Sequence, residues 1–302
     1  MRGPWTFVAA ATLAAAMLGV GVGYIVWGWP NNWYRQRDIS SLPSGAQADL
    51  IRYGWKLIVE TPRYIGKSAA DPTKRFAGND LACTHCHIRA GLKPFAAPFV
   101  STFASFPMMV NDQVISLVER VDGCMTRSMN GSPMPANSRE MEAILAYIQF
   151  VGRDTPVGVR IAGMGLRPLR QAEHQPDAAR GQAVYREYCA ACHRDEGQGE
   201  LLTGAIGYDN PPLWGPDSFN SAAGMNNVNT AAAFIHANMP PGADFGSPLL
   251  TEQQAWDVAT FITSQSRPAP RARPSIGGSN NTGQNSLSAH GRNQQLNYKP
   301  SS

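Results

Sequence analysis

The sequence predicts a mainly α-helical protein that contains two similar domains. One reason is a short motif, C-x-x-C-H, which occurs once in each half, at Cys83–His87 and at Cys189–His193. Another is that a helical pattern precedes each copy and a second amphipathic pattern follows it. A stretch bearing Pro and Gly, residues 153–175, separates the two halves. The 302 residues of the chain are enough for two small domains.

Each half is expected to begin and end with a helix. Asp49 and Asp177 are the expected N-caps of the first helices, because Asp accepts hydrogen bonds from the free N–H groups of a first turn. Gly54 and Gly181 occupy corresponding places in these patterns, where a small residue lets a second helix cross closely. The last helices open on capping-box patterns, Asn137-x-x-Glu140 and Thr251-x-x-Gln254. The chain therefore repeats one plan twice.

The C-x-x-C-H motif is the attachment site of covalent haem c. Two thiols three positions apart on one helical turn add to the two vinyl groups on one porphyrin edge, and the histidine ligates the iron. Zinc sites and redox dithiols also use C-x-x-C, but the adjoining histidine in both copies argues against them. We expect two haem c groups with their iron, held by Cys83, Cys86, His87, Cys189, Cys192 and His193.

Terminal helices that cross beside a haem, with irregular loops around it, describe the class I cytochrome c fold. We expect two such domains, residues 31–155 and residues 177–267, joined by a linker at residues 156–176. The tail, residues 268–302, is rich in Pro, Ser, Asn and Gly and holds few hydrophobic residues, so we expect it to be disordered.

The N-terminal segment is strongly apolar, with no charged side chain from residue 4 to residue 30. A run of roughly 25 residues is longer than the core of a signal peptide and long enough to span a bilayer. We expect residues 1–30 to form a transmembrane anchor, and the small residues Ala9–Ala16 leave a cleaved signal peptide open. Because haem c is attached outside the bacterial cytoplasm, the body is expected on the periplasmic side of the inner membrane, or soluble in the periplasm if the segment is cleaved.

The formal net charge of +4 is concentrated at the two ends of the chain. Five basic residues and no acid follow residue 266, and Arg2 is the only charge before Pro30. The body between them carries a net charge of −2. A basic tail of this kind gives no argument for nucleic acid as a partner.

The iron of the second half needs a sixth ligand, and Met239 is the expected one. Met239-Pro240 follows a helical pattern, which is the usual place of the distal ligand in a cytochrome c. A thioether ligand favours the reduced iron and raises its potential, which suits a site where electrons leave. His236 is the rival ligand and lies further back on the helix.

The first half offers two candidates for the sixth ligand, Cys124 and Met134. Cys124 is the fifth cysteine of the chain, so at least one thiol stays outside any disulfide pairing. In an oxidising compartment coordination to iron protects a free thiol, because the metal deprotonates it and holds the sulfur. Met134-Pro135 looks like an ordinary Met-Pro ligand. The residues favour Cys124 and leave Met134 open.

Several longer stretches of the body are more specific than the haem motifs. They are Glu60–Arg63, Cys83–His87 with Ala90–Pro94, Arg120–Gly131, Pro156–Gly158, Pro212–Asn220 and Gly224–Met225. In these stretches, spread between residues 49 and 263, the chain resembles the dihaem thiosulfate dehydrogenases, which form tetrathionate. Some members carry a lysine beside the distal methionine, whereas this chain has His236 and Asn238 beside Met239.

The resemblance implies an active-site haem ligated by His87 and Cys124, and an electron-transfer haem ligated by His193 and Met239. It implies the joining of two thiosulfates to tetrathionate in the first domain. The electrons are then expected to pass to a small cytochrome c or another periplasmic redox acceptor.

Two thiosulfate dianions repel each other, so their site needs cationic, hydrogen-bonding surroundings. Arg120 and Arg127 lie four residues before and three residues after Cys124, which brings them near one another on a helix. Ser128 and Asn130 add hydrogen-bond donors. We take these five residues as the candidate catalytic set, in which the Cys124 sulfur forms a transient S–S adduct with the first thiosulfate.

Two other functions fit the same motifs. One is a membrane-anchored dihaem electron carrier without a substrate, in which Cys124 only lowers the potential of its haem. The other is a cytochrome subunit of a sulfur-oxidising multienzyme system. Thiosulfate added to the oxidised protein distinguishes the enzyme from the carrier.

Overall fold

The computed structural model describes residues 37–110 and 112–271. The expected membrane anchor at residues 1–30 lies outside the described residues, and so does the expected tail from residue 272 onward. In the described part of the chain, no helix is both long enough and apolar enough to cross a membrane. The described residues are mainly helical, as the sequence predicts.

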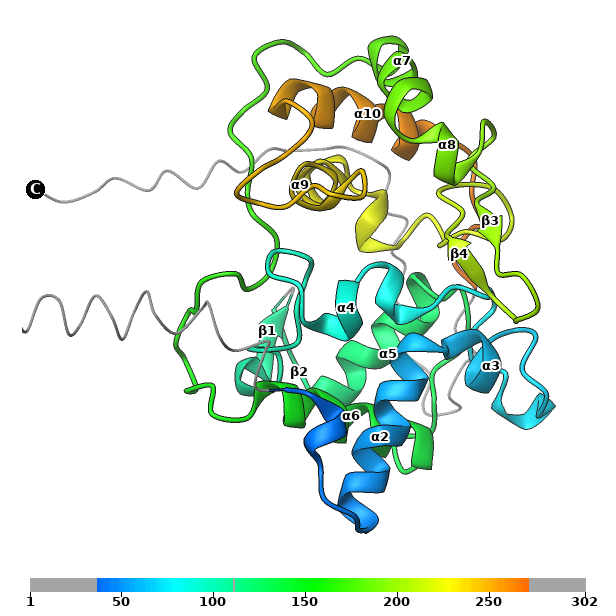
Figure 1. The fold of residues 1–302 in the computed structure, drawn as a ribbon, viewed down its shortest axis with the longest axis vertical. Coiled ribbons are helices and arrows are strands. Elements are labelled where there is room, and N and C mark those ends of the chain that lie inside the picture. The colour runs from blue at the N-terminus through cyan, green and yellow to red at the C-terminus, as the bar shows by residue number, and fades with distance from the viewer. Residues whose placement is uncertain (1–36, 111, 272–302) are drawn as a thin grey trace, which may run out of the picture. The chain divides into compact units, whose positions relative to one another are not determined.

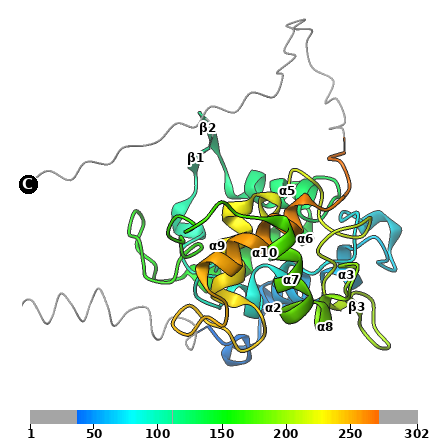
Figure 2. The same ribbon diagram turned by 90° about the horizontal axis from the view of Figure 1, so that it is seen from above.

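The first half contains five α-helices and one β-hairpin among the described residues (Figure 1). The helices are α2 (Ala46–Val59), α3 (Thr61–Ile65), α4 (Ile88–Gly91), α5 (Leu117–Arg127) and α6 (Arg139–Gly152). The strands β1 (Met108–Val110) and β2 (Gln113–Ile115) pair antiparallel, and Figure 2 shows this hairpin standing out from the helices. Short 3₁₀ helices lie at Ile39–Ser41, Pro72–Lys74, Cys83–His85 and Phe103–Ser105.

The second half has four α-helices and a smaller antiparallel strand pair in the described residues. The helices are α7 (Ala178–Tyr188), α8 (Ala190–His193), α9 (Val228–Asn238) and α10 (Glu252–Ser264). The strands are β3 (Glu200–Leu201) and β4 (Tyr208–Asn210), and a 3₁₀ helix lies at Gly224–Asn226. Figure 1 shows α7, α9 and α10 gathered above α2, α5 and α6, which belong to the first half.

The first and last helices of each half cross at a glycine. A Cβ atom added at Gly54 of α2 would lie 2.0 Å from the carbonyl oxygen of Ala143 in α6. A Cβ atom added at Gly181 of α7 would lie 2.0 Å from the carbonyl oxygen of Asp257 in α10. Real side chains do not approach backbone this closely, so both crossings depend on glycine. The prediction of close helix crossings at these two positions is confirmed.

The helix starts of the second half agree with the sequence. Asp177 caps α7, and its side chain accepts a hydrogen bond of 2.8 Å from the backbone N–H of Arg180. Thr251 and Gln254 form the expected capping box at α10, with bonds of 2.9 and 3.1 Å. These contacts satisfy N–H groups that a first turn leaves without partners inside the helix.

The helix starts of the first half differ from the predicted residues. The N-cap of α2 is Gly45, so Asp49 lies in the first turn, where its charge still favours the positive helix end. The N-cap of α6 is Ser138, whose hydroxyl accepts from the backbone N–H of Met141 at 3.2 Å, and Asn137 lies one residue outside. Ser and Asn are similar capping residues, so the pattern alone does not separate them.

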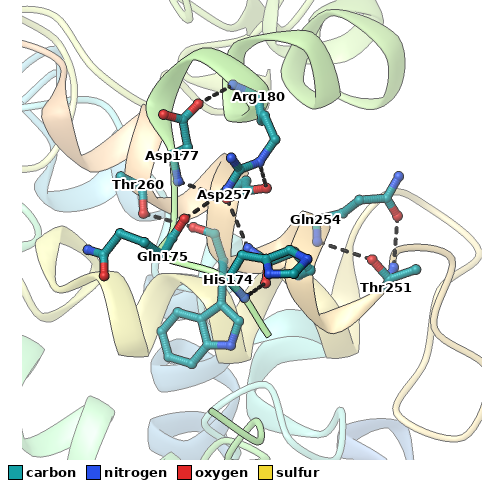
Figure 3. Close-up of polar contacts among 10 residues, drawn as sticks. His174, Gln175, Asp177, Arg180, Thr251, Gln254, Asp257 and Thr260 are labelled. Carbon is teal, nitrogen blue, oxygen red and sulfur yellow. Dashed lines mark hydrogen bonds and ion pairs between the residues drawn. The ribbon is translucent and has the colours of Figure 1, made fainter. Parts of the chain in front are cut away.

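Each crossing also holds one buried carboxylate. Figure 3 shows Arg180 of α7 reaching Asp257 of α10, with Nε and Nη2 donating to the two carboxylate oxygens at 2.9 Å. The backbone N–H of Asp177 donates to the same side chain at 2.8 Å. In the first half, the hydroxyl of Tyr53 donates to Glu140 at 2.8 Å. Hydrogen bonds to both carboxylates offset the cost of burying their charge.

Each half has its own hydrophobic core, and a cysteine of one haem motif packs against each core. In the first half, Leu57 of α2 and Tyr147 of α6 are fully buried, and Cys83 packs against their cluster. In the second half, Cys189 packs against the cluster that contains Val258 of α10. The helices therefore position the attachment cysteines from the inside of each half.

Candidate haem and active site

Both C-x-x-C-H motifs line one cavity of about 560 Å³. In each motif the backbone N–H of the histidine donates to the carbonyl of the first cysteine at 2.9 Å, so the motif forms the helical turn that the spacing requires. All five cysteines are free of disulfides, and each is partly buried. The cavity wall includes the six expected haem-holding residues Cys83, Cys86, His87, Cys189, Cys192 and His193.

His87 is oriented as an iron ligand. Its Nδ1 lies 2.6 Å from the carbonyl oxygen of Ala97 and donates to it, which leaves Nε2 without the proton and able to bind a metal. The Phe99 ring packs beside the imidazole, with centroids 4.6 Å apart. Burial lowers the pKa of His87, the hydrogen bond to Ala97 opposes this, and the charge of Arg120 lowers it further. The neutral imidazole is the form that ligates iron.

His193 has the same arrangement in the second half. Its Nδ1 lies 2.8 Å from the carbonyl oxygen of Pro211, and burial lowers its pKa. Each half thus presents a neutral imidazole whose Nδ1 is held by a carbonyl, beside two free thiols in an apolar cavity. This arrangement fits haem c.

The second half presents Met239 for the sixth position. Met239 is the C-cap residue of α9 and lines the cavity. His236 is buried and is not among the residues that line the cavity, and its Nδ1 has no hydrogen-bond partner in the described structure. The geometry therefore favours Met239 over His236 as the ligand, and the ligand assignment itself stays a prediction.

The first half presents Cys124 rather than Met134. Cys124 lies on α5 and lines the cavity. Cys83 and Cys86 line the same cavity as Cys124. Burial raises the pKa of the Cys86 thiol to about 12, and the charge of Cys124 raises it further. Met134 is only 3% exposed, packs in the first core, and is not part of the cavity wall. Met125 and Met129, which the sequence analysis did not weigh, also line the cavity.

One face of α5 forms part of the cavity wall. Arg120, Cys124 and Ser128 are spaced four residues apart, so they lie above one another on this face. Arg120 is exposed and therefore stands at the mouth of the cavity. Ser116 caps the helix, and its backbone N–H donates to the Glu119 carboxylate at 2.6 Å, which completes a capping box.

Arg127 and Asn130 lie elsewhere. The Nε of Arg127 donates to the carbonyl of Gly123 at 2.8 Å, so this side chain folds back on its own helix, and it is not part of the cavity wall. Asn130 is buried, with a positive φ of 46°, and its Oδ1 accepts from Nδ2 of Asn220 at 3.3 Å. The structure thus groups Arg120, Cys124 and Ser128 and separates the other two. The catalytic roles of all five stay predictions.

The end of α5 is held by the second half. Nδ2 of Asn220 donates to the carbonyl of Thr126 at 2.8 Å, and its backbone N–H donates to the carbonyl of Arg127 at 3.2 Å. Nδ2 of Asn79 donates to the carbonyls of Ser128 and Ser218 at 3.1 and 3.2 Å. The specific stretches Arg120–Gly131 and Pro212–Asn220 therefore meet in space. The sequence did not predict these roles of Asn79 and Asn220. The available signal was that Asn220 ends the stretch Pro212–Asn220, which is specific to the family but contains no expected haem ligand.

His85, inside the first haem motif, was also missed. It lines the cavity, and burial lowers its pKa to about 4. A histidine between the two cysteines was the available signal, since the attachment chemistry does not need it.

Both halves of the chain match known protein families. Residues 73–157 match the SoxA/TsdA cytochrome c domain, and residues 178–266 match the cytochrome c family. Over 239 residues the chain is 38% identical to a thiosulfate dehydrogenase of Stutzerimonas stutzeri, which covers 78% of this chain and 74% of that protein. The chain belongs to the thiosulfate dehydrogenase family. It is thus an enzyme of this kind by homology, and the predicted resemblance is confirmed.

Two further relatives extend this finding. The thiosulfate dehydrogenase of Allochromatium vinosum is 37% identical over 275 residues, 89% of this chain and 97% of that protein. The solved thiosulfate dehydrogenase (TsdBA) of Marichromatium purpuratum superposes with a TM-score of 0.69 at 35% identity, over 80% of this chain. The chain spans half the length of that solved chain. Two cytochrome c domains imply haem c, and they confirm the helical two-domain part of the predicted fold.

Proposed function

We propose that the protein oxidises two thiosulfate ions to tetrathionate beside His87 and Cys124, and that the electrons leave through the site of His193 and Met239. The observation that carries this proposal is the cavity-lining face of α5, which presents a thiol, a guanidinium group and a hydroxyl together. Kinship with proteins named thiosulfate dehydrogenase supports the substrate class.

Arg120 is suited to bind the anionic substrate. It lines the same cavity as His87 and Cys124, where the substrate would lie. A guanidinium group at the mouth of an apolar cavity attracts a dianion and hydrogen-bonds its oxygens. Ser128, two helical turns further along the same face, supplies a hydroxyl donor. Arg127 contributes positive charge from outside the cavity wall.

Cys124 forms and then breaks an S–S bond in this proposal. Its thiolate joins the outer sulfur of the first thiosulfate, and the pair loses two electrons. The second thiosulfate attacks the sulfur that came from the first, which releases tetrathionate and restores the thiolate. Two dianions thus become one dianion and two electrons, with no proton gained or lost. The two haem irons, when bound, supply two one-electron acceptors.

Electrons are proposed to leave from the second half to a small cytochrome c or a similar redox protein. Apolar side chains are exposed at the end of β3 and on the loop that leads to β4, namely Leu201, Leu202 and Ile206, with 66, 38 and 43% of their surfaces accessible. This loop precedes Pro211, whose carbonyl holds His193. An exposed apolar spot beside a redox site supports brief docking of a partner protein.

We also propose that the protein works on the periplasmic side of the inner membrane, anchored through residues 1–30. The apolar run and the haem c motifs of the sequence support this location. Cell fractionation of the full chain and of a chain whose apolar run is replaced by a cleavable signal peptide tests the anchor. Recovery of both in the soluble periplasmic fraction would show cleavage instead.

The decisive test of the activity uses the oxidised protein with both haems bound, without oxygen. Thiosulfate is added, and haem reduction and tetrathionate are measured together. We expect reduction with one tetrathionate for every two electrons. Unchanged haem spectra with no tetrathionate would make the protein an electron carrier.

Arg120→Gln tests the substrate-binding face. A charge-assisted hydrogen bond is worth about 1.5–3 kcal/mol, and exposure reduces this, so we expect kcat/KM for thiosulfate to fall about tenfold. Arg186→Gln, on the exposed surface of α7, is the matched control and should keep the wild-type value. Equal values for both variants would remove Arg120 from the binding site.

A further inference from the structure

His85 uses both of its ring nitrogens, one within its own half and one across to the other. Nδ1 accepts a hydrogen bond of 3.0 Å from the backbone N–H of Ala82. Nε2 lies 3.1 Å from the carbonyl oxygen of Tyr208 in β4. Because Nδ1 is an acceptor, the ring proton is on Nε2, which therefore donates to Tyr208. With both nitrogens engaged, His85 is not available as an iron ligand.

The strand that His85 contacts leads directly to the iron ligand of the second half. β4 runs from Tyr208 to Asn210, and the next residue, Pro211, accepts the Nδ1–H of His193 at 2.8 Å. A short stretch of backbone thus connects the two carbonyl groups, one bound by His85 and one by His193. His85 itself lies in the turn Cys83–His85 that carries the first haem attachment.

Other contacts join the halves at different places. Asn79 and Asn220 hold the Pro212–Asn220 stretch against α5, and Lys67 pairs with Asp217. Among the described residues, His85 is the side chain of the first half that forms a hydrogen bond with the backbone of β4. Tyr208 of β4 also packs against the hydrophobic core of the first half. The hydrogen bond from His85 adds a directional contact that links this strand to the first haem motif.

We propose that His85 is a positioning residue that sets the two haem sites relative to each other through Tyr208. It holds β4, and β4 holds the Pro211 carbonyl that orients His193. The proposal needs both haems bound and does not depend on thiosulfate as the substrate.

Loss of this contact has two consequences that a general loss of stability does not produce. The first is slower electron exchange between the haems, because electron transfer depends on their placement. The second is a raised reduction potential of the haem at His193. A weaker hydrogen bond from Nδ1 to Pro211 makes the imidazole a poorer donor, which stabilises the oxidised iron less.

Three variants separate the two hydrogen bonds. His85→Gln keeps an acceptor and a donor at the far end of a long side chain, so it should keep most of the wild-type electron exchange rate and haem potential. His85→Asn keeps the contact with Ala82 but is too short to reach Tyr208, and His85→Leu lacks both. His174→Asn, at an exposed histidine of the segment before α7, is the matched control.

The experiment injects one electron by laser photoreduction into the oxidised protein with both haems and follows its redistribution. We expect slower exchange between the haems in His85→Asn, because electron transfer depends on their separation and orientation. Redox titration should show a raised potential at the His193 haem in the same variant. Both properties should be close to wild type in His85→Gln and His174→Asn.

Wild-type exchange and potential in His85→Asn would overturn the proposal, and so would equal impairment of His85→Gln and His85→Asn. NMR of the reduced wild-type protein with ¹⁵N-labelled histidine tests it without any variant, should the variants fail to fold. We expect a slowly exchanging proton on Nε2 of His85. A proton on Nδ1, or fast exchange at Nε2, would contradict the contact with Tyr208.

Discussion

Replacing Gly181 by alanine puts a methyl group where α7 crosses α10. The new Cβ atom would lie 2.0 Å from the carbonyl oxygen of Asp257 and 2.9 Å from Cβ of Phe261. Ordinary contact begins at 3.4 Å, so the helices must separate by about 1.4 Å at this point. The nearest neighbour is backbone, which cannot rotate away. The cost therefore belongs at the upper end of overpacking, about 3 kcal/mol.

Helix propensity acts in the opposite direction, because alanine in a helix interior is better than glycine by about 1 kcal/mol. We therefore expect Gly181→Ala to lower the free energy of unfolding by about 2 kcal/mol. Guanidinium unfolding, followed by far-UV circular dichroism with both haems bound, measures this difference. Gly224→Ala is the matched control, because a Cβ atom there meets nothing within 4 Å. A Gly181→Ala protein as stable as wild type would refute the crossing argument.

Three smaller changes test single contacts. Desolvation raises the pKa of Asp257, but hydrogen bonds led by Arg180 outweigh it and hold that pKa below its usual range. The Asp257 carboxylate therefore stabilises the fold fully above about pH 4, and this contribution is lost as the pH falls further. In Asp257→Asn, the free energy of unfolding should depend less on pH when it is measured from about pH 5 to about pH 2. Met239→His should lower the potential of the haem at His193 in a redox titration, because the thioether raises it; an unchanged potential would remove Met239 as ligand. Asn220→Ala should cost about 1–3 kcal/mol in guanidinium unfolding, since it removes the Nδ2 donor from the Thr126 carbonyl and from Oδ1 of the buried Asn130.

Local patterns predicted the parts of this fold that depend on neighbouring residues. The C-x-x-C-H turns, the Asp177 cap and the Thr251 capping box each need residues within one helical turn, so sequence spacing is sufficient. The glycines at the crossings were also readable, because each stood at the same place in both halves. The caps of α2 and α6 shifted to Gly45 and Ser138, since several nearby residues cap equally well.

The site depends on contacts between residues far apart in sequence, and these were less predictable. Spacing placed Arg120 and Arg127 equally near Cys124, but only the packing of α5 shows which side of the helix faces the cavity. Asn220 and His85 act across the two halves, over 94 and 123 positions of sequence. No local pattern reports such a pairing. The one indication in the sequence was the stretch Pro212–Asn220, which is specific to the family although no local structure requires its residues.

Thiosulfate oxidation by a Cys124→Ala protein with both haems bound tests the central claim most directly. If Cys124 makes the S–S bond, the rate should fall by about 10²-fold or more, while the haem at His193 keeps its spectrum and potential. Cys124→Met should lose the activity as well, because a thioether cannot form the bond even where it can ligate iron. Full activity in either variant, with both haems present, would contradict a catalytic role for Cys124.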